Sequence, residues 1–191
     1  MVQLAIFASG TGTNAAAIIS RFRDHPGIRV ALVVSNKPGA PVLDLARSHG
    51  IPALVLEKDR FAHGDAYVEP LLDFPIDFIV LAGFLLKIPP PLIKAFPNRI
   101  INLHPALLPK YGGKGMYGHF VHDAVIAAGE KESGISIHYV DEWYDHGNII
   151  YQARCPVDGQ DTPLTLARKI QQLEHTHYPE VIEKTLEMLK K

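Results

Sequence analysis

The sequence contains a single cysteine, Cys155, among its 191 residues. A lone thiol excludes an intrachain disulfide and a zinc site built from several thiolates. No apolar run can span a bilayer, because even the apolar N-terminal stretch over 2–8 is far too short. No signal-peptide pattern precedes that stretch, so we expect a cytoplasmic protein that has no membrane partner.

An excess of charge of one sign is also missing. Lys and Arg total 19 against 20 Asp and Glu, which gives a formal net charge of −1. Without a broad basic surface, nucleic-acid binding is not expected. Hydrophobic residues make up 47% and charged residues 20%, as in ordinary globular proteins. The length suits a single domain over 1–191.

Short β-branched runs alternate with amphipathic stretches along the first hundred residues. This pattern predicts strands over 2–8, 28–35, 52–56, 77–82 and 100–104, with helices over 14–22, 40–49, 61–72 and 89–96. Beyond residue 133 it predicts an antiparallel strand pair, 135–140 and 149–153, and a long helix over 163–189 with Pro179 inside it. The expected fold class is α/β: a Rossmann-like, mostly parallel twisted sheet with flanking helices, an antiparallel C-terminal strand pair and a long C-terminal helix.

The loop over 9–14, Ser-Gly-Thr-Gly-Thr-Asn, joins the first predicted strand to the first predicted helix. Two glycines, the hydroxyls of Ser9, Thr11 and Thr13, and a helix N-terminus are typical of a phosphate cradle. It is not a dinucleotide fingerprint, because no acidic residue follows the second strand, which ends at Ser35 and Asn36. An empty glycine-rich turn remains the alternative.

Asn102 and His104 lie two apart in the strand over 100–104 and therefore point to the same face. An amide and an imidazole at the carboxyl end of a strand can both donate to the oxygen of a reacting carbonyl. Asp145, in the turn before the last strand, could orient His104 and raise its pKa. The alternatives are a capping histidine and ordinary turn chemistry at Asn102 and Asp145.

These three segments occur in the order found in a known family. The loop over 9–14, the segment Asn102-Leu103-His104-Pro105 continuing to Tyr111, and Asp145-x-Gly147 before Ile149 and Ile150 resemble the phosphoribosylglycinamide formyltransferases. The resemblance covers nearly the whole chain. It implies transfer of the formyl group of 10-formyltetrahydrofolate to the amine of N1-(5-phospho-D-ribosyl)glycinamide, in purine (IMP) biosynthesis, through a tetrahedral intermediate. It also implies a phosphate-binding half, about 1–100, and a folate-binding and catalytic half, about 100–191.

The resemblance assigns a role to each matching residue. Asn102, His104 and Asp145 match the catalytic residues, and His122 is placed near them with His119 at the surface. The substrate-binding residues it implies are Gly12, Thr13, Asn14, Gln171, Gln172, Leu173 and Glu174. The folate-binding residues it implies are Leu85, Leu86, Lys87, Ile88, Asn102, Asp141, Glu142, Trp143, Tyr144 and Asp145. It implies small-molecule partners, no metal, and a monomer or homodimer.

The sequence departs from the family at two positions. Gly64 and Leu86 stand where relatives carry an arginine for the folate glutamate tail, and Lys87 and Arg60 are alternative partners for that tail. The glycine-rich segment over 112–118 is expected to be mobile.

Several competing hypotheses follow from the same residues. The first is a hydrolase that releases formate from the same folate, and the second is a non-catalytic phosphate-binding module. The hydrolase is less expected, because such proteins usually have an additional regulatory domain and here the first strand begins at residue 2. Formyl transfer to a tRNA would need a basic domain after residue 180, where the sequence offers only three lysines. His119 with His122 and His175 with His177 are too few ligands for a zinc site.

Overall fold

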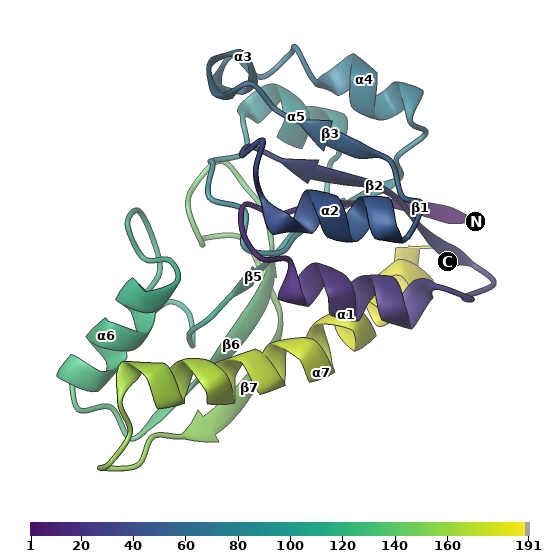
Figure 1. Ribbon diagram of the computed structural model, residues 1–191. Helices are drawn as coiled ribbons and strands as arrows, with labels where there is room; N and C mark the ends of the chain where they lie inside the picture. The colour runs from purple at the N-terminus through teal and green to yellow at the C-terminus, as the bar shows by residue number, and fades with distance from the viewer. Residues whose placement is uncertain (190–191) are drawn as a thin grey trace. The chain divides into compact units, whose positions relative to one another are not determined.

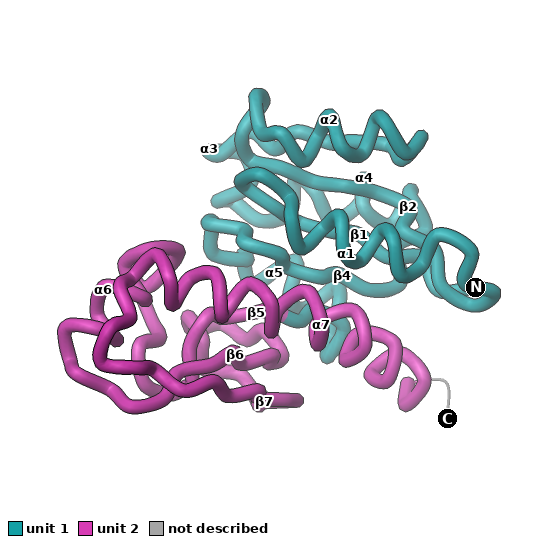
Figure 2. The backbone as a smooth tube through the Cα atoms, turned by 60° about the horizontal axis from the view of Figure 1, so that its bottom comes forward, with its two compact units in different colours: residues 1–101 teal, residues 102–191 magenta. Residues whose placement is uncertain are grey.

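The computed structural model describes residues 1–189, and the chain forms two compact units, Met1–Ile101 and Asn102–Lys191 (Figure 2). The first unit contains four parallel strands: β1 (Val2–Phe7), β2 (Ile28–Ser35), β3 (Ala53–Val55) and β4 (Phe78–Leu81), in the order β3-β2-β1-β4. Leu4 of β1 pairs with Val30 of β2 on one side and with Phe78 of β4 on the other. All four residues of β4 are buried, as expected for a strand covered on both faces.

Five helices belong to the first unit: α1 (Thr13–Phe22), α2 (Pro41–Ser48), α3 (Lys58–Ala62), α4 (Val68–Asp73) and α5 (Pro90–Ala95). The amphipathic helix α1 buries four residues at helical spacing, Ala15, Ile18, Ile19 and Phe22. Figure 1 shows α1 and α2 side by side, and both contact β2. The helix α4 contacts α5 instead.

The prediction of one helix over 61–72 is wrong, because α3 and α4 are separate helices. Gly64 lies between them with φ at +87°, a left-handed conformation that ends a helix. A Cβ at Gly64 would lie 2.7 Å from Cδ of Pro91 and 3.0 Å from Cβ of Pro89. The break is therefore fixed both by the backbone conformation and by the space available.

The second unit contains the end of β5 (Ile100–His104), then α6 (His119–Ala127), β6 (Glu132–Tyr139), β7 (Ile149–Pro156) and α7 (Pro163–Leu189). The strand order is β5-β6-β7, and β6 and β7 form the predicted antiparallel pair, with Ile135 opposite Ala153. The long helix α7 runs along β6 and β7 and also contacts α6 (Figure 1). Pro179 is buried inside α7 without ending it. The sequence analysis did not predict α6.

The predicted fold class is confirmed: a mostly parallel sheet with flanking helices, an antiparallel strand pair and a long last helix. Each unit has its own apolar core. Leu4, Ile6 and Val33 are fully buried in the first unit, as are Ile135 and Ile137 in the second. Over the described residues 1–189, none of the helices has the length and hydrophobicity needed to cross a membrane.

Candidate active site

The loop between β1 and α1 has the backbone geometry expected of an anion-binding turn. Gly12 has φ at +81°, and a Cβ at this position would lie 2.7 Å from Cγ2 of Val42, so glycine is required here. The carbonyl of Gly12 accepts a hydrogen bond from the amide of Ala16 at 2.8 Å, and this is the first hydrogen bond of the helix. No side chain caps α1, so its positive end is not covered by a capping group.

Ser9 does not contribute its hydroxyl to this turn, contrary to the expectation from its sequence position. Its Oγ donates to Oδ1 of Asn36 at 2.5 Å and accepts the amide of Leu85 at 2.9 Å, and the residue is buried. The amide of Ser9 also donates to the carbonyl of Gly83 at 3.1 Å. Ser9 thus ties together the loops that follow β1, β2 and β4 at the carboxyl edge of the first sheet.

The predicted folate segment over 85–88 follows β4, and its side chains differ in exposure. Leu85 is exposed, whereas Ile88 is buried, so Ile88 can offer a ligand only its main chain. Arg60, one alternative partner for a glutamate tail, donates to Glu57 at 3.0 Å and lies over the ring of Tyr67. Gly64 has no room for a side chain.

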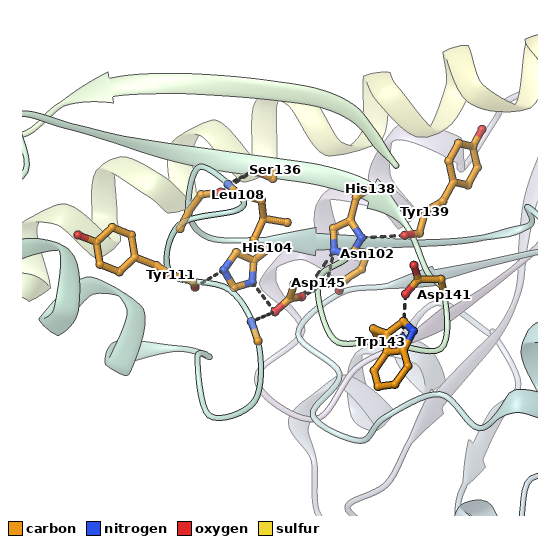
Figure 3. A network of polar contacts seen from close by, with 12 residues as sticks. Asn102, His104, Leu108, Tyr111, Ser136, His138, Tyr139, Asp141, Trp143 and Asp145 are labelled. Atoms are coloured by element: carbon orange, nitrogen blue, oxygen red, sulfur yellow. Dashed lines mark hydrogen bonds and ion pairs between the residues drawn. The ribbon is translucent and has the colours of Figure 1, made fainter. Parts of the chain in front are cut away.

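The second unit brings Asn102, His104 and Asp145 together, although the last two are 41 positions apart in the sequence (Figure 3). Asn102 and His104 lie at the end of β5, and Asp145 lies in the loop between β6 and β7 with φ at +53°. Oδ2 of Asp145 is 3.5 Å from Nδ1 of His104, and Oδ1 is 3.4 Å from Nδ2 of Asn102. The predicted convergence of an amide, an imidazole and a carboxylate is therefore present.

His138, in β6, joins this cluster and was not predicted. Its Nε2 lies 3.1 Å from Nδ2 of Asn102 and 3.6 Å from Oδ1 of Asp145. Its Nδ1 lies 2.8 Å from the carbonyl of Tyr139, an arrangement that suits a proton on Nδ1 and an acceptor at Nε2. A signal existed in the sequence, because Ser136 and His138 alternate with Ile135 and Ile137 and so place polar groups on one face of a buried strand.

The loop after β5 supplies two main-chain groups that residue types cannot reveal. The carbonyl of Tyr111 accepts Nε2 of His104 at 2.7 Å (Figure 3), and the amide of Gly113 donates to Oδ2 of Asp145 at 2.9 Å. Both ring nitrogens of His104 therefore face oxygen atoms of the protein. The imidazole is held between a carbonyl and a carboxylate, which fixes its orientation.

The pKa of His104 is lowered, whereas the sequence analysis expected Asp145 to raise it. Burial has the largest effect, since the residue is 3% exposed, and a charged imidazole is costly in such surroundings. The charge of Asp145 and the carbonyl of Tyr111 raise the pKa, but together they do not outweigh burial. His104 is therefore mainly neutral at neutral pH, and a new negative charge beside it would favour its protonation.

Asp145 keeps its negative charge despite its partial burial. Burial raises the pKa of this carboxyl, but the hydrogen bond with His138, the charge of His104 and the amide of Gly113 lower it further, and the net direction is downward. The site thus holds a fixed carboxylate beside an imidazole that can gain a proton. That combination suits general acid–base chemistry near neutral pH.

His122 and His119, on α6, are placed as the resemblance implied. His122 is buried, and its pKa is lowered by burial, with a smaller contribution from the charge of nearby His104. His119 is exposed and stacks on Phe120, with ring centroids 4.0 Å apart. Within the part of the chain that the structure describes, no group of three His, Cys, Asp or Glu side chains could hold a metal ion.

The other predicted binding residues of the second unit lie in one loop and one helix. In the loop, both oxygens of Asp141 are engaged: Oδ1 accepts the amide of Trp143 at 2.8 Å, and Oδ2 is paired with His146 at 2.7 Å. Glu142, Trp143 and Tyr144 are exposed there. On α7, Gln171 and Gln172 are exposed, while Leu173 and Glu174 are half-buried.

Comparison with known proteins agrees with this geometry. A chloroplastic phosphoribosylglycinamide formyltransferase of Arabidopsis thaliana is 43% identical over 186 residues, which cover 94% of this chain and 64% of the plant protein. The phosphoribosylglycinamide formyltransferase of Bacillus subtilis is 37% identical, with 97% of this chain and 95% of that protein covered. The chain therefore spans less than two thirds of the plant relative but nearly all of the bacterial one.

Solved structures give the same result. The crystal structure of phosphoribosylglycinamide formyltransferase from Bacillus halodurans matches with a TM-score of 0.88 and 40% identity, covering 96% of this chain and 95% of that one. A sequence profile described as formyl transferase matches residues 2–182. The chain belongs to the formyl transferase family.

Proposed function

We infer that this protein transfers the formyl group of 10-formyltetrahydrofolate to the amine of N1-(5-phospho-D-ribosyl)glycinamide, a step of purine biosynthesis. The observation that carries this proposal is that the side chains of Asn102 and His104 both lie within 3.5 Å of the carboxylate of Asp145. Family membership supports it, because the similar proteins from Arabidopsis thaliana and Bacillus subtilis carry the name of this activity. Both substrates are small molecules.

The first unit is proposed to hold the phosphate of the glycinamide ribonucleotide. Gly12, Thr13 and Asn14 form the start of α1, where main-chain amides and the helix dipole favour an anion. Leu85, Leu86, Lys87 and Ile88 are proposed to contact the pterin, mainly through the main chain, because Ile88 is buried. Gly12 has a left-handed backbone conformation, and this conformation shapes the turn over 9–14 that would bind the phosphate.

The second unit is proposed to carry the chemistry and the remaining contacts. The loop residues Asp141, Glu142, Trp143 and Tyr144 would contact the folate. Gln171 and Glu174 lie three apart and share a face of α7 that would meet the ribose, with Gln172 and Leu173 beside them. Asn102, His104 and Asp145 would act on the reacting carbonyl.

The bound folate would supply an activated formyl group on its N10 atom. The amine of the second substrate forms a bond to the formyl carbon, the bond from that carbon to N10 breaks, and one proton leaves the amine while one arrives at N10. Asn102 would give up its contact with Asp145 and donate that N–H to the oxygen of the formyl group as negative charge develops there. Protonated His104 would donate to the same oxygen through Nδ1, which lies 3.5 Å from Asp145, beyond the usual length of a hydrogen bond. Asp145 stabilises the protonated form of His104 and, through a water molecule, helps to move the proton of the amine to N10.

Incubation of the purified protein with 10-formyltetrahydrofolate tests the proposal directly. We expect the formyl group to be lost only when glycinamide ribonucleotide is present, with formylated product appearing in equal amount. Loss without the acceptor would show a hydrolase instead. No loss under either condition would leave a phosphate-binding module. The control is the same mixture with glycine in place of the ribonucleotide, which lacks the phosphate that the first unit would hold.

Replacement of His138 by leucine is expected to lower kcat about tenfold. The leucine cannot accept a hydrogen bond from Nδ2 of Asn102, so the amide loses one of the contacts that orient it. A hydrogen bond of this kind is worth about 0.5–1.5 kcal/mol. His138→Gln, which restores an acceptor, should recover part of the activity. The Asn102→Ala substitution should cost less in the His138→Leu background than alone. Additive costs in this cycle would contradict the link between the two residues.

A further inference from the structure

Glu130 lies in the turn between α6 and β6, outside the cluster proposed to carry the reaction. Its Oε1 accepts two hydrogen bonds from neighbouring residues of the loop after β5. Nζ of Lys110 donates at 2.8 Å, and the hydroxyl of Tyr111 donates at 2.9 Å. These two contacts lower the pKa of Glu130, which keeps the acceptor charged. One carboxylate thus fastens two successive side chains of the same loop.

The loop that Glu130 holds, residues 110–113, contacts His104 and Asp145 through its main chain. The carbonyl of Tyr111 accepts Nε2 of His104 at 2.7 Å (Figure 3). Two residues later, the amide of Gly113 donates to Oδ2 of Asp145 at 2.9 Å. Any shift of Tyr111 would therefore move a partner of the imidazole and, through Gly112, a partner of the carboxylate.

The backbone conformation of Tyr111 is unfavourable unless other residues stabilise it. Its φ is +56°, a left-handed conformation that costs a non-glycine residue about 1–2 kcal/mol. The earlier part of the loop is fixed separately, because the amide of Leu108 donates to Oγ of Ser136, and Nε2 of Gln152 donates to the carbonyl of Leu108. Both of these hydrogen bonds are made by Leu108, so they fix the loop only up to that residue. The contacts to Glu130 are hydrogen bonds made by the side chains of Lys110 and Tyr111 themselves.

Space next to the loop would allow it to move if the hold were lost. A cavity of about 230 Å³ is lined by Lys110, Tyr111 and Glu130, together with apolar groups of Leu107, Leu108 and Val125. Glu132 and Arg154 lie at the same cavity and form their own ion pair. A released Tyr111 could relax into this volume and carry its carbonyl away from His104.

We propose that Glu130 is a positioning residue for the formyl transfer: by holding Lys110 and Tyr111, it sets the carbonyl of Tyr111 against His104 and the amide of Gly113 against Asp145. This inference rests on the proposed function. Glu130 itself touches neither substrate nor the reacting atoms. Its influence passes through the loop over 110–113 to the side chains that do.

The Glu130→Ala substitution is expected to lower kcat about tenfold, the effect of about 1.4 kcal/mol, and to change KM for either substrate by less than twofold. Glu130→Gln, which keeps an acceptor for the phenol, should recover part of the loss. The matched control is Glu132→Ala, which removes an ion-paired carboxylate from the same cavity without touching the loop, and its kcat should equal that of the wild type. An equal loss in both variants would overturn the proposal, as would wild-type turnover in Glu130→Ala.

Tyr111→Phe separates the two contacts of Glu130. It removes only the phenol hydrogen bond, so its loss should be smaller than that of Glu130→Ala, and the double variant should be no worse than Glu130→Ala alone. Additive losses would mean that Glu130 acts by another route. Melting temperatures within a few degrees of wild type would show that the loss does not arise from unfolding.

An NMR titration of His104 tests the positioning without any assay of activity. The groups around this imidazole are Asp145, His138, His122 and the Tyr111 carbonyl, and of these Asp145 and the carbonyl favour protonation. In Glu130→Ala the titration midpoint of His104 should therefore move to lower pH, while Glu132→Ala leaves it in place. An unchanged midpoint would overturn the positioning role. If the wild-type protein shows no formyl transfer, the proposed function fails, but this measurement still decides whether Glu130 orients the loop.

Discussion

Replacement of His104 by alanine is expected to reduce kcat by roughly 10²–10³-fold, the typical cost of removing one donor to a developing oxyanion. The imidazole is held by the Tyr111 carbonyl on one nitrogen and faces Asp145 with the other. Burial lowers its pKa in the free protein, so the ring is ready to take a proton when negative charge appears on the formyl oxygen. Alanine offers neither a donor nor a proton.

Steady-state rates with both substrates, measured beside melting temperatures, would check this result. KM should change little, because the lost interaction belongs to the transition state. His177→Ala is a suitable control, since it removes a half-buried imidazole that is hydrogen-bonded to the hydroxyl of Tyr151 and is not a residue of the proposed site. Turnover of His104→Ala within threefold of wild type would remove His104 from the mechanism.

The parallel strands could be predicted from the sequence because their burial on both faces gives continuous β-branched runs. Two strands, Ile28–Ser35 and Ile100–His104, have the predicted bounds, as does the long helix α7. The single helix over 61–72 was wrong because the left-handed Gly64 and its contact with Pro91 depend on tertiary packing. The helix α6 was missed because its two polar histidines and apolar residues form no clear amphipathic stripe after a glycine-rich segment.

The candidate site was predictable only as far as residue types and spacing reach. Asn102 and His104 share a face of one strand, Asp145 was a candidate from its place in the turn before the last strand, and the resemblance to a known family gave these three residues a catalytic role. The main-chain groups of Tyr111 and Gly113 carry no signature in residue type, so their part in the site required the folded chain. Asp145 raises the pKa of His104 as expected, but the net shift is downward because burial outweighs this effect, and the sequence does not report burial.

The Asp145→Asn substitution is expected to lower kcat about hundredfold while preserving the size of the side chain. The carboxylate accepts hydrogen bonds from the amides of Gly113 and Asn102 and faces His104, three groups that favour a negative acceptor. An asparagine retains one acceptor oxygen and places an amide NH2 group beside donors, and each lost bond to a charged group costs about 1.5–3 kcal/mol. Asp158→Asn, at an exposed pair with Lys169, is the control.

The pH dependence of Asp145→Asn distinguishes an electrostatic role from a purely structural one. Asp145 raises the pKa of His104 against the opposing effect of burial, so the neutral substitution must lower that pKa further. Whichever form of the imidazole is active, the limb of the kcat/KM profile that reports His104 should move to lower pH. A variant that lost activity only because the amide of Asn102 was no longer held would keep the limb where it is, since that amide is not among the groups that set the pKa of His104. An unmoved limb with a large loss of kcat would therefore separate Asp145 from the protonation of His104 and leave it only the task of holding Asn102 in place.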